Sequence, residues 1–205
     1  MKSQLELDLQ KGRWGGWRKN AGRKAKKSPG VGHVRREKIS KRTPVHINFR
    51  LNQKVRTEKG LEALKAAISN SQKFFSVIHY SVQSNHIHLI LEAENNQLLT
   101  KGMRSFAVTF AKHLGKGSIQ KERYHLHVLK GKRETQNAFR YVIFNEVHHS
   151  KKRTIRADLF SSLHRLNLKE LSVEYKINIT KINLKEKIEI DQPASWLAKQ
   201  GLNPT

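Results

Sequence analysis

The 205-residue sequence contains no cysteine and no apolar run near the ~18 residues that a membrane-spanning helix requires. Without cysteine the chain has neither a disulfide framework nor a thiolate metal site, so any metal ligand must be histidine, carboxylate or amide. The N-terminal residues also lack the apolar segment of a secretory signal peptide. These absences predict a soluble, cytoplasmic protein with no membrane partner.

Acidic residues are scarce too, because 16 Asp and Glu stand against 41 Lys and Arg. The net charge is +25 and the pI is near 10.6. A field of this sign and size favours polyanions, and nucleic acid is the default partner of such a chain. We therefore expect a nucleoid-associated protein with one folded domain and flanking segments.

Residues 1–43 are rich in positive charge, with 14 Lys and Arg against three acidic residues. Their weak apolar periodicity predicts a flexible basic arm. Residues 16–24 resemble the Gly-Arg-rich arms that lie in a DNA minor groove, and a solvated polybasic tail is an equal alternative. The residues expected to contact DNA are Arg13, Arg18, Lys19, Arg23, Lys24, Lys26, Lys27 and, farther along the chain, Arg123.

From residue 44 the apolar pattern predicts elements in the order β-α-β-β-α-β-α. This order is the ferredoxin-like plan, an α+β fold with an antiparallel sheet and one appended helix. A short Gln83-Ser84 turn predicts that the second and third strands form a hairpin. We expect strands over 44–51, 74–82, 86–92 and 123–129, helices over 55–70, 95–114 and 133–148, a catalytic domain over 44–150, and a C-terminal extension of unassigned role over 151–205.

His86 and His88 are two residues apart on the predicted strand that follows the turn. The period of a strand puts both on one face, where two neutral imidazoles can hold one divalent cation. Spacing alone leaves a packed or exposed role open, and such a role is the commoner one for a histidine pair. His125 and His127 form a second pair within a charged segment, where a solvated or phosphate-contacting role is favoured.

The predicted helix over 133–148 places Ala138, Tyr141, Val142 and Asn145 on one stripe. Tyr141 and Asn145 are four residues apart, so they lie one above the other on a helix. An amide oxygen from Asn145 could complete a two-histidine site for a hard or borderline ion. The alternative is that Tyr141 is a core residue and Asn145 only a residue near the helix end.

Four sequence blocks resemble the IS200-like single-tyrosine (Y1) transposases of the HUH endonuclease superfamily, especially the REP-associated tyrosine transposases. They are 81–89 around His86-Ile87-His88, Lys101-Gly102-Met103, Arg123-Tyr124-His125, and 138–145 around Tyr141. The resemblance implies that His86 and His88 bind Mg²⁺ or Mn²⁺, with Asn145 as a third ligand or polar helper. It also implies that Tyr141 cleaves single-stranded or hairpin repeat DNA through a 5′-phosphotyrosine intermediate and allows strand transfer.

Two positions depart from the family pattern, which often has Met-Pro at Gln83-Ser84 and proline at Glu146. A carboxylate at Glu146 could alter metal preference or weaken phosphate binding. The resemblance favours a monomer, with a dimer that exchanges tyrosine helices as the alternative. No general base is identified, although His148 and His149 lie one turn beyond Asn145.

Two other classes of protein stay open at this point. One is a non-catalytic DNA- or RNA-binding protein on the same scaffold, which the charge and the arm support as well as they support an enzyme. The other is a relaxase or replication initiator, which uses the same kind of histidine pair to nick DNA.

Overall fold

The structure is a computed structural model that describes residues 36–115, 117–119, 123–145, 154–157, 160–166, 178–181, 188–199 and 201. Several residues that the sequence singles out lie outside this description. They are the expected DNA contacts between Arg13 and Lys27, and also Glu146, His148 and His149.

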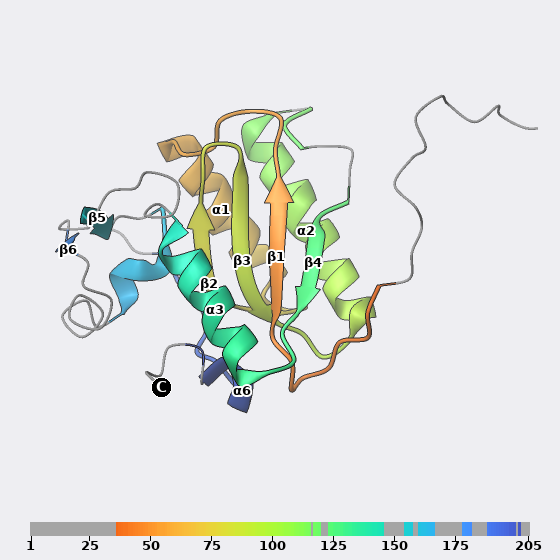
Figure 1. The fold of residues 1–205 in the computed structure, drawn as a ribbon. Helices are drawn as coiled ribbons and strands as arrows, with labels where there is room; N and C mark the ends of the chain where they lie inside the picture. The colour runs from red at the N-terminus through yellow and green to blue at the C-terminus, as the bar shows by residue number, and fades with distance from the viewer. Residues whose placement is uncertain are drawn as a thin grey trace, which may run out of the picture. The chain divides into compact units, whose positions relative to one another are not determined.

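Four strands form one antiparallel sheet in the order β2-β3-β1-β4 (Figure 1). Helix α1 connects β1 to β2, α2 connects β3 to β4, and α3 follows β4. The predicted ferredoxin-like α+β fold and its element order are confirmed. The elements are β1 (Val45–Arg50), α1 (Glu58–Ser71), β2 (Ser76–Val82), β3 (His86–Glu92), α2 (Asn96–Leu114), β4 (His125–Val128) and α3 (Lys132–Ile143).

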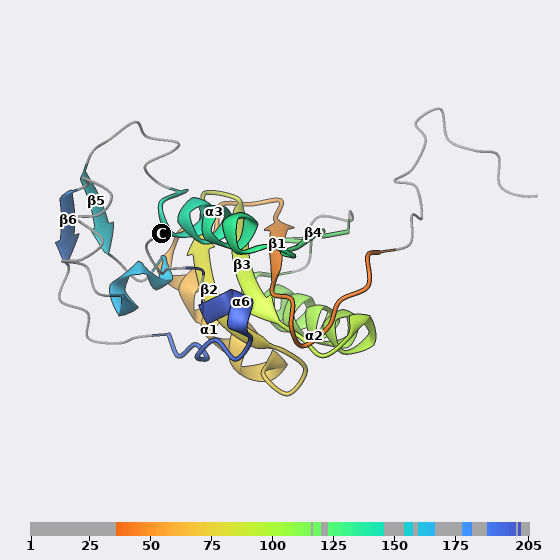
Figure 2. The same cartoon turned by 60° about the horizontal axis from the view of Figure 1, so that its bottom comes forward.

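Helices α1 and α2 cover one face of the sheet, and α3 lies on the other (Figures 1 and 2). Because strand side chains alternate, each strand sends every second residue toward α1 and α2. In β3 these residues are Ile87, Leu89 and Leu91, which belong to the main core. Ile90 instead packs with α3, so the predicted separation of the two faces of this strand is confirmed.

Local signals set the beginnings of α1 and α2. The Thr57 side chain accepts a hydrogen bond from the amide of Gly60, which caps α1. Asn95 caps α2 through bonds from the amides of Gln97 and Leu98, as the predicted helix start requires. Gly102 then lets α2 approach the segment just before β2, because a Cβ there would lie 2.5 Å from the ring of Phe75.

The face that carries α3 has a smaller apolar cluster, in which Phe139, Val142 and Ile143 of α3 meet Ile78 and Ile90. A bulge between Val77 and His79 turns both Ile78 and His79 toward α3. The His79 Nδ1 atom lies 2.8 Å from Oγ of Ser162, at the start of the 3₁₀ helix η1 (Ser162–Arg165). This buried bond holds η1 against β2.

The described C-terminal residues return to the same sheet and to α3. The Glu92 carboxylate accepts bonds from the amides of Ala194 (2.8 Å) and Ser195 (2.7 Å), just before α6 (Trp196–Lys199). Gly201 contacts α3 so closely that a Cβ would lie 2.5 Å from the ring of Phe139. Two further strands, β5 (Thr154–Ala157) and β6 (Asn178–Lys181), pair in parallel.

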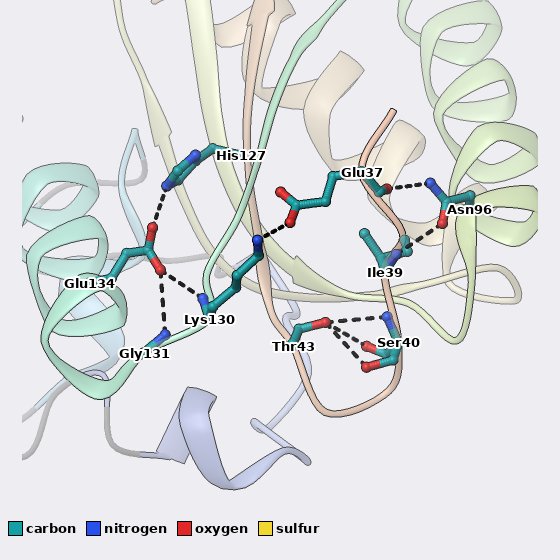
Figure 3. Close-up of polar contacts among 9 residues, drawn as sticks. All are labelled: Glu37, Ile39, Ser40, Thr43, Asn96, His127, Lys130, Gly131 and Glu134. Atoms are coloured by element: carbon teal, nitrogen blue, oxygen red, sulfur yellow. Dashed lines mark hydrogen bonds and ion pairs between the residues drawn. The ribbon is translucent and has the colours of Figure 1, made fainter. Parts of the chain in front are cut away.

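Residues 36–43, the end of the predicted arm, are held against β4 and the start of α2 (Figure 3). Glu37 forms an ion pair with Lys130, and the Asn96 side chain bonds both the Glu37 carbonyl and the Ile39 amide. Ile39 itself is buried in the main core. Among the helices of the described residues, none is both long and apolar enough to cross a membrane.

Candidate functional site

The face of the sheet beneath α3 is rich in histidine. Cross-strand partners in an antiparallel sheet lie on the same face, so the register identifies its members. His88 of β3 is opposite Asn48 of β1, and His46 of β1 is opposite both Ile90 and His127. The histidines on this face are His46, His79, His86, His88, His125 and His127.

Three of these rings form a compact group at the centre of the sheet. The rings of His86 and His88 are 4.9 Å apart, and those of His46 and His88 are 5.1 Å apart. The Nε2 atom of His46 lies 3.0 Å from Nδ1 of His88, within hydrogen-bonding distance. His88 is only 2% exposed, whereas His86 is half-buried at the start of β3.

Helix α3 brings Tyr141 to this group. The Tyr141 ring meets His88 edge-on at 5.3 Å and also contacts His46 at 6.1 Å. With 38% of its surface exposed, Tyr141 is accessible, so it is not the core residue that the alternative interpretation required. It lies at the edge of the helix stripe, whose buried members are Thr135, Gln136, Phe139, Val142 and Ile143.

The position of Asn145 differs from the prediction of a continuous helix to 148. Helix α3 ends at Ile143 with Phe144 as its C-cap, so Asn145 lies beyond the turn that carries Tyr141. Asn145 is fully buried, and neither amide atom has a hydrogen-bond partner among the described residues. Burying an amide without partners costs about 1–3 kcal/mol, which is a reason to expect a ligand there.

Asn48 shows the same property next to the histidines. Its Oδ1 atom is buried without a hydrogen-bond partner in the described part of the chain, and its strand position is directly opposite His88. This residue was not among the predicted site residues. Its signal was the alternation of β1, which puts Asn48 on the polar face together with His46.

The donor atoms available for a cation here are imidazole nitrogens and amide oxygens, a set for a hard or borderline ion. Within the described residues, no three His, Asp or Glu side chains are grouped to hold a metal ion. A cation at His86 and His88 would therefore take its other ligands from amide oxygens, water or phosphate. Amide oxygens suit Mg²⁺ or Mn²⁺, whereas imidazole nitrogens suit more borderline divalent ions. The buried amide oxygens of Asn48 and Asn145 lack other partners in the described part of the chain.

Two histidines on this face are neutral near pH 7. Burial lowers the pKa of His46 to about 4, with smaller contributions from the nearby His127 and His125. Burial alone lowers the pKa of His79 to about 4. Neutral rings can accept as well as donate hydrogen bonds, which protonated rings cannot.

A cavity of about 780 Å³ opens beside Tyr141, between β4 and the first turns of α3. Next to it, the Glu134 carboxylate accepts a bond from the Lys130 amide and contacts Nε2 of His127, both at 2.7 Å (Figure 3). The Lys130 amide, together with His127 and Gly131, holds the pKa of Glu134 below its usual value. The cavity lining includes His46, His127, Lys132, Arg133, Asn137 and Tyr141.

The remaining predicted residues are less closely connected to this group. His125 and His127 are exposed, in agreement with the solvated role expected for this pair. Arg123 is exposed just before β4, and its contact with DNA stays a prediction. The structure thus brings together His86, His88 and Tyr141, and it adds His46 and Asn48, which were not predicted.

Comparison with known proteins gives a match at the level of the fold. No family model and no curated protein matches the sequence. A solved structure described as "Structure of the REP associates tyrosine transposase bound to a REP hairpin" is similar, with a TM-score of 0.57 and 20% sequence identity. The match covers 69% of this chain and 88% of that chain.

Proposed function

We propose that this protein is a metal-dependent single-strand DNA endonuclease and strand transferase of the tyrosine transposase kind. Tyr141 would be the nucleophile, and His86 and His88 would hold the cation. The observation that carries the proposal is the edge-on contact at 5.3 Å between His88 and Tyr141, on separate elements. The similar fold of a tyrosine transposase supports the same assignment.

The chemistry is a transesterification at phosphorus. The Tyr141 Oη atom forms a bond to phosphorus while the bond from phosphorus to the 3′-oxygen breaks. The phenol proton passes to a base, and the departing 3′-oxygen takes up a proton. A 5′-phosphotyrosine and a 3′-hydroxyl result, so a later 3′-hydroxyl can reverse the reaction and join strands without ATP. Bound Mg²⁺ or Mn²⁺ would polarise a non-bridging phosphate oxygen.

Nucleic acid is the substrate class that the charge supports. With a net charge of +25 the protein would draw DNA to its surface in a salt-dependent way. The cavity beside Tyr141 has room for a nucleotide next to the scissile phosphate, with Lys132 and Arg133 at its margin. The similar structure is described with a REP hairpin, so we propose hairpin DNA with single-stranded flanks as the substrate.

Covalent capture of DNA tests the assignment of Tyr141. Wild-type protein with Mg²⁺ or Mn²⁺ and hairpin DNA should give a protein–DNA adduct on a denaturing gel. Tyr141→Phe should give none, because it lacks the nucleophilic oxygen, while its DNA affinity stays within about twofold. The matched control is Tyr124→Phe, which removes the hydroxyl group of a tyrosine whose ring packs under Arg36 and should keep the adduct.

Each alternative has a distinct result in the same assay. An undiminished adduct in Tyr141→Phe contradicts the choice of nucleophile. Tight DNA binding by the wild type with no adduct under any metal condition supports a non-catalytic DNA- or RNA-binding protein instead. The net charge by itself favours the enzyme and the binding protein equally.

We further propose that a monomer is sufficient for activity, since His88 and Tyr141 of one chain are already in contact. Mixing Tyr141→Phe with His88→Ala should therefore fail to restore the adduct. Restoration to a sizeable fraction of the wild-type yield would show that two chains exchange their tyrosine helices. Light scattering of the wild type with and without DNA gives the oligomeric state independently.

A further inference from the structure

His46 lies at the centre of the candidate site without belonging to any motif that points to catalysis. It is on β1, the strand next to β3, and its ring contacts both His88 and Tyr141. Its polar contact is the one between His46 Nε2 and His88 Nδ1, which are 3.0 Å apart. His46 therefore touches two of the three residues to which the proposed function gives a chemical role.

The proton in that contact determines what His88 can do. If His46 donated, the neutral His88 would carry its own proton on Nε2, and neither of its nitrogens could bind a cation. If His88 donates from Nδ1, its Nε2 keeps a lone pair directed away from His46. Only the second arrangement is compatible with His88 as a metal ligand, and it requires His46 to be the acceptor.

We propose that His46 is a positioning residue that accepts a hydrogen bond from Nδ1–H of His88. This bond fixes the His88 tautomer and the orientation of its ring, so that Nε2 is directed to a divalent cation. The inference rests on the proposed function, because it takes His88 as a metal ligand. Its ligand class is Mg²⁺ or Mn²⁺, and His46 supports the cation without binding it.

The surroundings of His46 support the acceptor role. The ring is half-buried, and a neutral imidazole keeps a lone pair on one of its two nitrogens. Metal-binding histidines commonly have such a partner on the second nitrogen, and its loss costs about 10- to 100-fold in metal affinity. The His46 ring also contacts the Tyr141 ring at 6.1 Å, so the same residue touches the proposed ligand and the proposed nucleophile.

His79 provides a matched control within the same face of the sheet. It is buried and neutral, and its Nδ1 is hydrogen bonded to Oγ of Ser162, as Nε2 of His46 is to His88. Its ring contacts Phe139 of α3 instead of Tyr141. A substitution at His79 therefore reports the general cost of removing a buried histidine from this face.

The test compares His46→Leu, His46→Gln and His79→Gln in the full chain, with thermal unfolding as the check on folding. Mn²⁺ affinity is measured by electron paramagnetic resonance, without DNA. We expect Mn²⁺ binding to be about 10- to 100-fold weaker in His46→Leu. In His46→Gln the affinity should recover toward that of the wild type, because the amide oxygen can accept the hydrogen bond from His88. In His79→Gln it should change little. In the metal-free wild type, ¹⁵N spectra should show the proton of His88 on Nδ1.

Four results would overturn the inference. Unchanged Mn²⁺ affinity in His46→Leu would show that the bond has no influence on cation binding. Equally weakened Mn²⁺ binding in His79→Gln would show that the effect of His46→Leu comes from the loss of a buried histidine in general. A third coordinated imidazole in electron spin-echo spectra would show that His46 binds the cation directly. A proton on Nε2 of His88 would show that His46 is the donor and His88 the acceptor of the bond. Failure of the wild type to bind Mn²⁺ would instead contradict the proposed function itself.

Discussion

The two faces of the four-stranded sheet are built from alternate residues of the same strands but have opposite chemistry. Toward α1 and α2, β1 and β3 present an unbroken apolar layer. Toward α3 the same strands present His46, Asn48, His86 and His88, which lie beside an accessible tyrosine. The first face forms the main apolar core, and the second carries the residues to which the proposed function assigns cation binding and nucleophilic attack.

The polar face is itself divided into two parts. Beside Phe139, its polar groups are occupied within the protein, as with His79 on Ser162 and Glu92 on the amides before α6. Opposite His88 and just after the end of α3, the buried amide oxygens of Asn48 and Asn145 have no hydrogen-bond partner among the described residues.

The largest effect is expected from the double substitution His86→Ala and His88→Ala. It should reduce Mg²⁺-dependent adduct formation by about 1,000-fold or more, equivalent to about 4 kcal/mol in the activation free energy. The measurement is the single-turnover rate on hairpin DNA at saturating Mg²⁺. Cleavage that persists in this variant would show that the pair is structural.

Leu89→Ala is the control for the opposite face, since Leu89 is adjacent to His88 in sequence and fully buried. It should lower the free energy of unfolding in urea by about 3 kcal/mol through loss of apolar contacts and the cavity left behind. The adduct rate per folded molecule should stay close to that of the wild type. A variant that folds well but has lost the reaction would contradict this division between the two faces.

An intermediate effect is expected from the titration of His79, whose pKa is about 4 in the folded protein against an ordinary value of 6.5. As the pH falls, His79 of the unfolded chain is protonated before His79 of the folded protein. The contribution of the neutral His79 to the free energy of unfolding is therefore complete above pH 6.5 and lost toward pH 4. At pH 5 the loss amounts to about 2 kcal/mol. In urea titrations at pH 7.5 and pH 5, the free energy of unfolding should therefore decrease by less in His79→Gln than in the wild type. An equal decrease in both proteins would show that the titration of His79 is not the cause.

The smallest effect is expected at the structural end of the polar face, from Glu92→Gln. The substitution removes the carboxylate charge and replaces one of its two acceptor oxygens by an NH₂ group. One of the two backbone amides before α6 then faces a donor instead of an acceptor. The free energy of unfolding should fall by about 1 kcal/mol, measured in urea, with an unchanged adduct rate. An equal loss of adduct would place Glu92 in the reactive part of the face.

The sequence was sufficient to predict most of the fold, because the main signals are local. Alternation in β1 and β3, the Asn95 cap and the apolar stripes of α1 and α2 each depend on residues close together in the chain. The bulge in β2 left no such signal, although it determines that His79 faces α3. The end of α3 at Ile143 was also missed, because the apolar pattern continues beyond it.

The candidate site was only partly predictable, since it depends on which strands are neighbours. His86, His88 and Tyr141 were selected from a motif and a family resemblance, and their grouping agrees with the ring contacts. His46 and Asn48 could be found only by combining the alternation of β1 with the strand order β2-β3-β1-β4. The metal-binding and catalytic roles of all these residues stay predictions.

The contact between Gly201 and Phe139 has a consequence for the order in which the protein becomes complete during translation. All four strands precede α3 in the chain, so the histidine face can be assembled early. The helix that carries Tyr141 obtains its packing against Ala198 and Gly201 only after those late residues have left the ribosome. The strands that carry the histidines are therefore synthesised before the residues that complete the packing of the helix with Tyr141.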